Sequence, residues 1–511
     1  MPMKPVAVFQ TKKALWARLY CLKSYQISSA CLALALSACS LAPPASTPAV
    51  PVPAAWKAQP QAPAGWVSAD AAQAWAQGQW WRLWDDPTLH ALMARANAHN
   101  PTLQAAAASV RQAEALLAQQ QAARWPTLGL GGNQQRAGGD ARATGGSGAL
   151  NLTASWAPDL WGRVADSARA QGANVQASRA DLAAARLSVQ ASLALAYFAL
   201  RTADAEIALL DGIIDAYARS AAITRHRYDA GVAARTDTLQ AQSTLDNARA
   251  SREALARSRA LGEHAVALLV GEPPAAFGLP AVPDWQAAMP AVPAGVPAAL
   301  LLRRPDVAAA ERAVAAANAR IGVARAAWFP NLTLSAAAGA GGAHLLDVIA
   351  APQLAWSLGL SLAQTLFDAG ARQAAEEQAL AAHAQATALY RQRALAAMKE
   401  VEDQLATQHS LARQISHARA NADTAARIER QMLNRYQAGL SAYTEVVTAQ
   451  ASALGARRAL MQLALQQQQA AVALVQALGG GWQAPWADGD TDAAHAAPPA
   501  PDAPSASDPG R

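Results

Sequence analysis

Cysteine and aromatic residues are scarce in this chain. Its 511 residues include three cysteines, Cys21, Cys31 and Cys39, and none follows position 39. A disulfide framework or a cysteine metal cluster in the body of the protein is therefore excluded. Aromatic residues make up 5% of the chain, although 52% of it is hydrophobic. This composition favours long, closely packed helices over a compact core built on Phe and Tyr.

Signatures of catalysis are missing as well. The nine histidines show no His-Glu-x-x-His spacing, and the chain has no Gly-x-Ser-x-Gly elbow and no phosphate-binding Gly-Lys-Ser/Thr motif. Its Gly-rich stretches lack the strand–turn–helix spacing of a nucleotide site. We therefore expect that the protein is not an enzyme and that it has neither catalytic residues nor a metal site.

The excess positive charge is confined to the amino terminus. The formal net charge is +6, but residues 1–38 contain five basic residues and no acidic one, and without them the charge is +1. A nearly neutral mature chain gives no reason to expect a nucleic acid as partner.

The same segment has the features of a secretory signal, because basic residues precede a short apolar run and small residues follow it. Leu36-Ser37-Ala38-Cys39 resembles the lipobox of bacterial lipoproteins, in which the cysteine becomes the first mature residue and carries lipid. We therefore expect a lipoprotein signal peptide over 1–38 and no cofactor other than covalent lipid on Cys39. Ser40, rather than an aspartate, fits export to the outer membrane. The alternative is an ordinary signal peptide with a chance cysteine.

Proline-rich stretches divide the mature chain. We expect a lipidated tether over 39–79, a linker over 273–297 and a disordered tail over 483–511. The linker holds seven prolines, too many for a helix. Two units of similar length lie between these stretches, 80–272 and 298–482.

The two units repeat each other. Arg227-Tyr228-Asp229-Ala230-Gly231 recurs 208 residues later as Arg435-Tyr436-Gln437-Ala438-Gly439, and Pro126-Thr127-Leu128 recurs 204 residues later as Pro330-Asn331-Leu332. A nearly constant offset of this kind indicates an internal two-fold repeat.

Each unit has the same expected order of elements. Apolar spacing predicts a helix over 88–124 or 306–329, and then two strand-like stretches with Gly-rich loops. A helix of about 65 residues follows, close to 100 Å long at about 1.5 Å per residue, and a second helix returns after Gly231 or Gly439. Such a helix must pack along its length against neighbours, as in a coiled coil. We expect a mainly α fold with a small β part.

Membrane crossing would fall to the strands. No run of about 20 apolar residues follows Cys39, so we expect no transmembrane helix. Four strands cannot close a barrel, because spanning barrels begin at about eight strands. Three chains would supply twelve strands. The alternative is a soluble all-helical bundle with disordered Gly-rich inserts.

The order and spacing of several short motifs resemble the TolC-like outer-membrane efflux proteins, in their NodT-type lipoprotein branch. The resemblance spans about Trp80 to Trp482. The motifs are Trp80-Trp81, Asp86-Pro87-Thr88-Leu89, Asn100-Pro101, Ser155-Trp156, Asp159-Leu160-Trp161-Gly162-Arg163, Arg304-Pro305-Asp306-Val307 with Glu311, Phe329-Pro330, Leu366-Phe367-Asp368 and Glu400-Val401-Glu402-Asp403. Ala157-Pro158 departs from the pattern, as does the tail after Trp482.

The resemblance implies a homotrimer that closes a 12-stranded β-barrel in the outer membrane, above a long α-helical coiled-coil barrel in the periplasm. It implies three partners: a periplasmic adaptor (membrane fusion protein), an inner-membrane pump, usually of the resistance-nodulation-division class, and outer-membrane lipid. The function would be the passive exit duct of a tripartite efflux pump for small molecules, gated at its periplasmic tip. The alternatives are the exit duct of a type I protein secretion system and a periplasmic coiled-coil scaffold lipoprotein.

Two sets of residues follow from the resemblance. The repeated turns should form the periplasmic tip and dock the adaptor, or they are helix caps only; their residues are Arg227, Tyr228, Gly231, Arg435, Tyr436 and Gly439. Asp237 and Glu445 match positions where the family keeps acids that line a cation-sensitive gate, although an ordinary solvated helix face is the alternative. Thr448 stands where some relatives have another acid.

Four aromatic residues lie at the ends of the expected strands: Trp156, Trp161, Phe329 and Phe367. They suit either aromatic belts at the membrane interface or packing at the junction of strands and helices.

Overall fold

The computed structural model describes residues 40–44, 46–57, 75, 77–139, 142–286, 290, 303–342 and 353–486. The expected signal peptide, Cys39 and most of the expected tail lie outside these ranges. The chain divides into two compact units. Unit 1 comprises Met1–Ala49, Ser109–Ser178 and Ala310–Arg391, and unit 2 comprises Val50–Ala108, Arg179–Ala309 and Gln392–Arg511.

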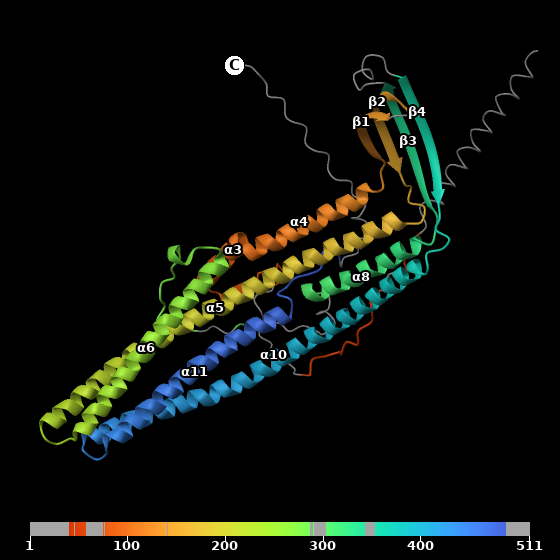
Figure 1. Cartoon of the computed structure of the whole chain (residues 1–511). Helices are drawn as coiled ribbons and strands as arrows, with labels where there is room; N and C mark the ends of the chain where they lie inside the picture. Colours follow the sequence, from red (N-terminus) through yellow and green to blue (C-terminus); the bar gives the residue numbers. More distant parts are fainter. Residues whose placement is uncertain are drawn as a thin grey trace, which may run out of the picture. The chain divides into compact units, whose positions relative to one another are not determined.

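A series of helix, two strands, long helix and returning helix occurs twice along the described chain (Figure 1). In the first half they are η1 (Trp80–Trp84), α3 (Pro87–His99), α4 (Pro101–Ala122), β1 (Thr127–Gly139), β2 (Arg142–Trp156), α5 (Arg163–Asp229), α6 (Arg235–Val270) and η2 (Pro274–Ala276). In the second half they are α8 (Pro305–Ala326), β3 (Asn331–Gly342), β4 (Gln353–Ala363), α10 (Ala371–Gln437) and α11 (Tyr443–Ala477).

Matching elements have matching lengths. Helices α5 and α10 each have 67 residues, and α4 and α8 each have 22 residues. The starts of α5 and α10, and those of the returning helices α6 and α11, have the same separation as the two Arg-Tyr turns. The starts of α4 and α8 have the same separation as Pro126 and Pro330. The offsets found in the sequence therefore hold for whole helices.

The first expected helix is not continuous. It is broken at Asn100, whose backbone is extended, and α4 starts at Pro101. Proline disfavours a helical conformation in the residue before it and has no N–H to donate. The Asn100 side chain compensates by accepting a hydrogen bond from the backbone N–H of Leu103, at 3.1 Å. The prediction of one helix over 88–124 was wrong at this point.

Among the described residues, one helix is long and apolar enough to span a membrane by length and composition alone. This is α5, and 39% of its most apolar 18-residue window is buried within the chain. The expectation that no helix would pass such a test was wrong, because the alanines of α5 count as apolar. Core helices of soluble bundles pass the same test, so this finding is weak evidence for a spanning helix.

Unit 1 contains an antiparallel four-stranded sheet in the order β1-β2-β3-β4. The register gives its two faces different chemistry, because side chains alternate along each strand. One row across the sheet is Leu130, Leu152, Ala338 and Trp356, and the neighbouring row is Leu128, Ala154, Ala336 and Leu358. Rows on the opposite face carry Thr, Ser, Asn, Gly and Ala. One face of the sheet is thus apolar and the other small and mostly polar.

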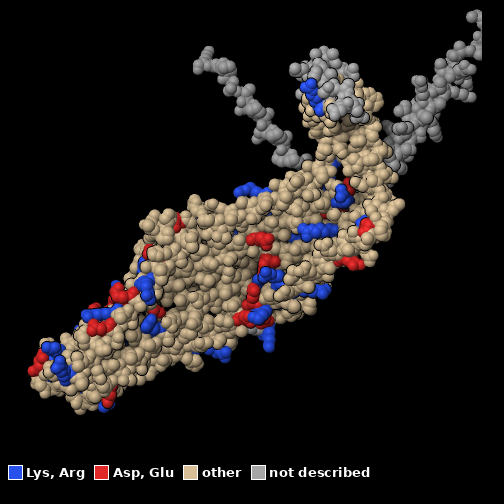
Figure 2. Space-filling view, viewed as in Figure 1, with Lys and Arg blue, Asp and Glu red and all other residues tan. Residues whose placement is uncertain are grey.

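The apolar face is exposed in the single chain. Trp356 is 82% exposed and Leu354, Leu358 and Leu360 are at least 70% exposed. Neither β3 nor β4 contains a charged residue, and most of the surface drawn over the strands in Figure 2 is uncharged. Among the described strands, β1 and β4 each have a neighbour on one side only. Unpaired edges beside an exposed apolar face are unfavourable in water.

The core of unit 2 is built around tryptophans. Trp80, Trp81 and Trp84 pack against Tyr197 and Phe198 of α5 and against valines of α6 and α11. The indole N–H of Trp80 donates to the Gln190 side chain at 3.0 Å, so this buried polar group is satisfied. The tryptophans of η1 therefore fix where the long helices meet in this unit.

Candidate functional site

The two turns that join the long helices to their returning helices have nearly the same backbone. Gly231 has a φ of 73° and Gly439 a φ of 77°, a left-handed conformation that glycine adopts without a steric penalty. The next residue in each turn donates its N–H back into the helix end, Val232 to the Arg227 carbonyl at 2.9 Å and Leu440 to the Arg435 carbonyl at 2.8 Å. Both turns are therefore helix caps in geometry.

The side chains of the first turn contact the second turn. The Arg227 guanidinium lies over the Tyr436 ring, 4.7 Å from its centroid, and donates to the backbone carbonyls of Tyr436 at 2.8 Å and Gln437 at 3.2 Å. These contacts add donors to carbonyls at the end of α10, where the Tyr436 carbonyl also accepts the Gly439 N–H at 3.0 Å. Arg227 thus joins the two halves of the chain at the tip of unit 2.

Tyr443, the first residue of α11, is buried at the same junction. Its ring meets that of Tyr436 edge to face at 5.1 Å, and its hydroxyl lies 3.2 Å from the Ser220 hydroxyl on α5. Only 1% of Tyr443 and 3% of Tyr436 is exposed. Tyr436 was predicted to dock a partner, but its burial assigns the ring to holding the two halves together. Of the turn residues, Tyr228, Arg435 and both glycines are exposed.

The two predicted gate acids occupy different surroundings. Asp237 is close enough to the tyrosines for its charge to act on both. Burial raises the pKa of Tyr436, the negative charge of Asp237 raises it further, and Arg227 opposes the rise. Burial also raises the pKa of Tyr443, against the hydrogen bond to Ser220, and Asp237 adds to that rise. Asp237 therefore faces the junction between the two halves.

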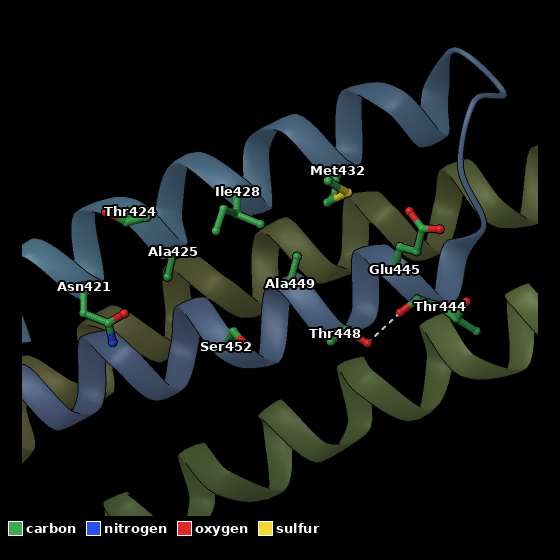
Figure 3. Close-up of a pocket in the computed structure, with 10 residues that line it drawn as sticks. All are labelled: Asn421, Thr424, Ala425, Ile428, Met432, Thr444, Glu445, Thr448, Ala449 and Ser452. Atoms are coloured by element: carbon green, nitrogen blue, oxygen red, sulfur yellow. Dashed lines mark hydrogen bonds between the residues drawn. The ribbon is translucent and has the colours of Figure 1, made fainter.

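Glu445 instead lines an open groove of about 500 Å³ between α10 and α11 (Figure 3). Ile428 and Met432 of α10 point toward Ala449 and Glu445 of α11 in this view. Ile428 is 45% exposed. The Thr448 hydroxyl is engaged within α11, where it donates to the Thr444 carbonyl at 2.9 Å. The groove is lined by apolar and neutral polar side chains and by one exposed carboxylate, that of Glu445.

The aromatic residues at the strand ends differ in their contacts. Trp161 stacks on Phe329 at 4.7 Å and donates to the Pro330 carbonyl at 2.7 Å, which is packing at the junction of strands and helices in unit 1. Trp156 and Phe367 are exposed, Phe367 by 86%. Trp156 also donates to the Arg124 carbonyl at 2.9 Å, so three of the four aromatic residues contact the junction, and an aromatic belt at the membrane interface stays a prediction.

Comparison with known proteins supplies the context for these features. The model of the outer membrane efflux protein family matches residues 92–272 and 296–480. The chain belongs to this family. It is 31% identical to the pyoverdine export outer membrane protein OpmQ of Pseudomonas aeruginosa over 90% of this chain and 98% of the relative. It is 30% identical to the cation efflux system protein CusC of Escherichia coli over 89% of this chain and 98% of the relative.

Solved structures give the same result. The outer-membrane channel OprN matches with a TM-score of 0.78 and 29% identity, over 87% of this chain and all of that one. The open state of the Neisseria gonorrhoeae outer membrane channel MtrE matches with a TM-score of 0.76 and 27% identity, over 87% of this chain and 99% of that one. The chain is therefore an efflux protein of the outer membrane with the mainly helical fold of these channels. The family's proteins are channels rather than enzymes.

The sequence did not single out Ser220, Tyr443 or Arg235 as tip residues. The available signal was a mismatch within the repeat, because Arg235 and Tyr443 begin equivalent helices in the two halves. The two repeats have the same backbone at this position, but one has a tyrosine and the other an arginine. Such a difference indicates that the two positions have different environments.

Proposed function

We propose that three copies of this chain form the exit duct of a tripartite efflux pump. The observation that carries the proposal is the sheet, with one apolar face, one mostly polar face and two open edges. In a bilayer every backbone group must be paired within the protein, so open edges are excluded. Three sheets joined edge to edge give a closed barrel of twelve strands, with leucines facing lipid and Thr, Ser and Asn facing the lumen.

The repeat supports the trimer in the helical part. Residues 80–272 and 298–482 are two copies of one unit, and their helices already pack side by side at the tip of unit 2. In a closed ring, the second unit of one copy meets the first unit of the next copy through the same kind of contact. The residues of that contact between copies can be predicted from the contact within one chain. Each tip residue is exchanged for the residue at the equivalent position of the other repeat.

Applied to the arginine contact, this exchange pairs two exposed side chains. Within the chain Arg227 lies over the ring of Tyr436. The equivalent contact between copies has Arg435 over the ring of Tyr228 of the partner subunit. Arg435 is exposed and Tyr228 is 39% exposed in the single chain, although the in-chain counterparts are engaged with each other. A cation over a tyrosine ring contributes about 0.5–2 kcal/mol, depending on how far it is desolvated.

Applied to the tyrosine contact, the exchange fills the groove of Figure 3. Within the chain Tyr443 contacts Ser220. The equivalent contact between copies has Arg235 of the partner subunit against Ile428, which lines the groove. The acid beside this position is Glu445, as Asp237 is beside Tyr443. A carboxylate thus faces an arginine between copies where it faces a tyrosine within a copy. The ion pair favours a closed tip and leaves it sensitive to cations.

The remaining assignments rest on the family and on the sequence. Lipid on Cys39 anchors the mature chain, after removal of residues 1–38. The exposed turns around Gly231 and Gly439 dock a periplasmic adaptor, which joins the duct to an inner-membrane pump of the resistance-nodulation-division class. The relatives are named for export of pyoverdine, cations, solvents and toluene, which supports small molecules or ions as cargo over proteins.

Electron microscopy of the detergent-extracted protein, together with single-channel recording in planar bilayers, tests this function. Trimeric tubes that carry a membrane collar and conduct ions are expected. Monomers or closed bundles without conductance would overturn the proposal. A protein that forms collared trimers but restores no resistance to small toxic compounds in an efflux-deficient strain would instead favour a protein secretion duct.

A further inference from the structure

The segment that directly follows Cys39 is bound to the helices of unit 1. The Ser40 hydroxyl donates to both carboxylate oxygens of Asp166, at 3.0 and 3.3 Å. Asp166 lies in the first turn of α5, and its side chain is fully buried. A buried carboxylate needs partners, and Asp166 has two, the Ser40 hydroxyl and the Arg169 guanidinium at 2.6 Å. A buried acid is thus aimed at the first residue after the predicted lipid site.

The next residues are held by their backbone carbonyls. Asn318 of α8 donates its side-chain amide to the Pro43 carbonyl at 2.9 Å, and Arg325 donates to the Leu41 carbonyl at 3.3 Å. Asn318 is almost fully buried, at 9% exposure. Arg325 is itself oriented by Glu376 of α10, at 2.9 Å. Recognition of backbone groups by side chains from α8 is independent of the segment's own side chains.

A glycine makes room for the segment. A Cβ at Gly322 of α8 would overlap the Asp166 carboxylate and come within 2.8 Å of the Ala42 backbone nitrogen. Glycine in a helix interior costs about 1 kcal/mol relative to alanine. Gly322 thus lies where the chain segment and the buried acid both approach the α8 backbone.

We propose that Asp166, Asn318, Gly322 and Arg325 form a binding slot for residues 40–43, and that this slot fixes the lipid attachment point beside the strands. The position in the chain supports the second part. Asp166 is in the first turn of α5, soon after β2, and Arg325 is in the last turn of α8, just before β3. Ser40 is one peptide bond from Cys39, so docking of Ser40 restricts the anchor to the membrane side of unit 1.

The slot changes the role of the amino-terminal segment. A free tether of residues 39–79 would let the lipid move far from the sheet. A docked segment instead holds the lipid and the strands at the same depth, so that both enter the bilayer together. The second part of this inference rests on the proposed lipid at Cys39, whereas the slot does not.

Hydrogen exchange of the full-length lipidated protein tests the slot, with Gly322→Ala compared with Gly172→Ala. Both substitutions gain the same helix propensity, but a Cβ at Gly172 meets nothing within 4 Å. Pro43 and Pro44 have no amide hydrogen, so the readout is the Ala42 amide, which donates to the Ser40 hydroxyl and should be protected in the natural protein. It should exchange about tenfold faster in Gly322→Ala, the factor that corresponds to about one lost hydrogen bond, and at an unchanged rate in Gly172→Ala.

Ser40→Ala provides a second, milder variant, because it removes the hydroxyl and leaves the helices untouched. It should also speed exchange of the Ala42 amide, which donates to the Ser40 hydroxyl at 3.3 Å. Exchange of the Ala42 amide at the rate of a free chain in the natural protein would overturn the slot, and so would equal rates in the two glycine variants. Mass spectrometry of the amino-terminal peptide separates the two parts, since a peptide without lipid refutes the anchor alone.

Discussion

The two turns at the tip of unit 2 share a backbone but differ in what covers them. Both follow helices of 67 residues and both end on a glycine with a φ above 70°. In the second turn Tyr436 and Tyr443 are buried against the first half, whereas in the first turn Tyr228 and Arg235 are exposed. The local sequence thus determines the backbone of each turn, whereas the helices packed against the turn determine how far its side chains are buried. Within one chain the second turn is covered by the first half, whereas the exposed side chains of the first turn are those that we propose to contact another copy.

The largest expected effect comes from removing the buried tyrosine. Tyr443→Ala deletes a side chain packed against Tyr436, and truncation of a buried aromatic residue costs about 3 kcal/mol or more. Amides near both turns should then exchange about 100-fold faster. Arg235→Ala is the matched control at the equivalent place in the first half, and in the dissociated single chain it should change exchange by less than about threefold, as is usual for an exposed charge.

Tyr443→Phe refines this comparison. It keeps the ring and removes only the hydroxyl that lies 3.2 Å from the Ser220 hydroxyl, so a loss of about 1 kcal/mol is expected. Equal effects of Tyr443→Ala and Arg235→Ala would show that the two turns have the same environment and would contradict the comparison.

The second prediction concerns the two equivalent arginines. Arg227→Met removes two hydrogen bonds to carbonyls and the contact with the Tyr436 ring, so tip exchange should rise by a factor of about 30, or about 2 kcal/mol. Arg435→Met should have no effect on exchange in a dissociated single chain. In the trimer it should speed tip exchange, by a smaller factor than Arg227→Met. Exchange measured on both forms checks this. An Arg435→Met effect of the same size in both forms would refute the proposed contact with Tyr228 of the partner subunit.

Much of the fold could be predicted because the signals are local and repeated. The glycines after α5 and α10 predict where these helices end, and the repeat of the Arg-Tyr turn predicts that both end at equivalent positions. The broken helix at Asn100 shows the limit, since apolar spacing continued through the break and only Pro101 signalled it.

The site was harder to predict than the fold. The sequence located the turns around Gly231 and Gly439, but not which faces of the helices meet. Burial of Tyr436 and the contact between Tyr443 and Ser220 arise between halves that are far apart in the sequence, and spacing along one helix carries no information on them. The docking of Ser40 on Asp166 was missed as well, because residues 39–79 were predicted from their composition to be a tether.

A third prediction compares the two equivalent helix starts at Asn100 and Arg304. Asn100 donates to the Leu269 carbonyl at the end of α6, and Arg304 donates to the equivalent carbonyl of the second half, that of Ala477 at the end of α11. The first junction has a neutral side chain. In the second, burial alone would raise the pKa of Asp306, but the hydrogen bonds and charge of Arg304 outweigh it, and the pKa lies below its ordinary value.

The pH dependence follows from that sign. A lowered pKa in the folded state contributes stability above about pH 4, the value for an unfolded aspartate. That stability is lost as the pH falls through the lowered pKa. Exchange near Arg304, corrected for its intrinsic pH dependence, should rise severalfold as the pH falls from about 4 through the lowered pKa of Asp306, and exchange near Asn100 should stay level. Asp306→Asn should abolish the difference. The same pH dependence of exchange at both junctions would contradict the role of the Arg304–Asp306 ion pair.

The smallest expected effect is at the two acids. Asp237 faces tyrosines and Glu445 lines the groove that Arg235 of the partner subunit is proposed to fill. If a ring of carboxylates admits and holds cations at the tip, then Asp237→Asn and Glu445→Gln should each weaken block of single-channel conductance by divalent cations, by about two- to fivefold. Glu445→Gln should in addition raise the resting conductance, because it also removes the partner of an arginine. Thr448→Val, in the same groove but uncharged, is the control and should leave block unchanged. Equal block in all three variants would assign both acids to the favourable placement of a negative charge in the first turn of a helix, where Asp237 and Glu445 both stand.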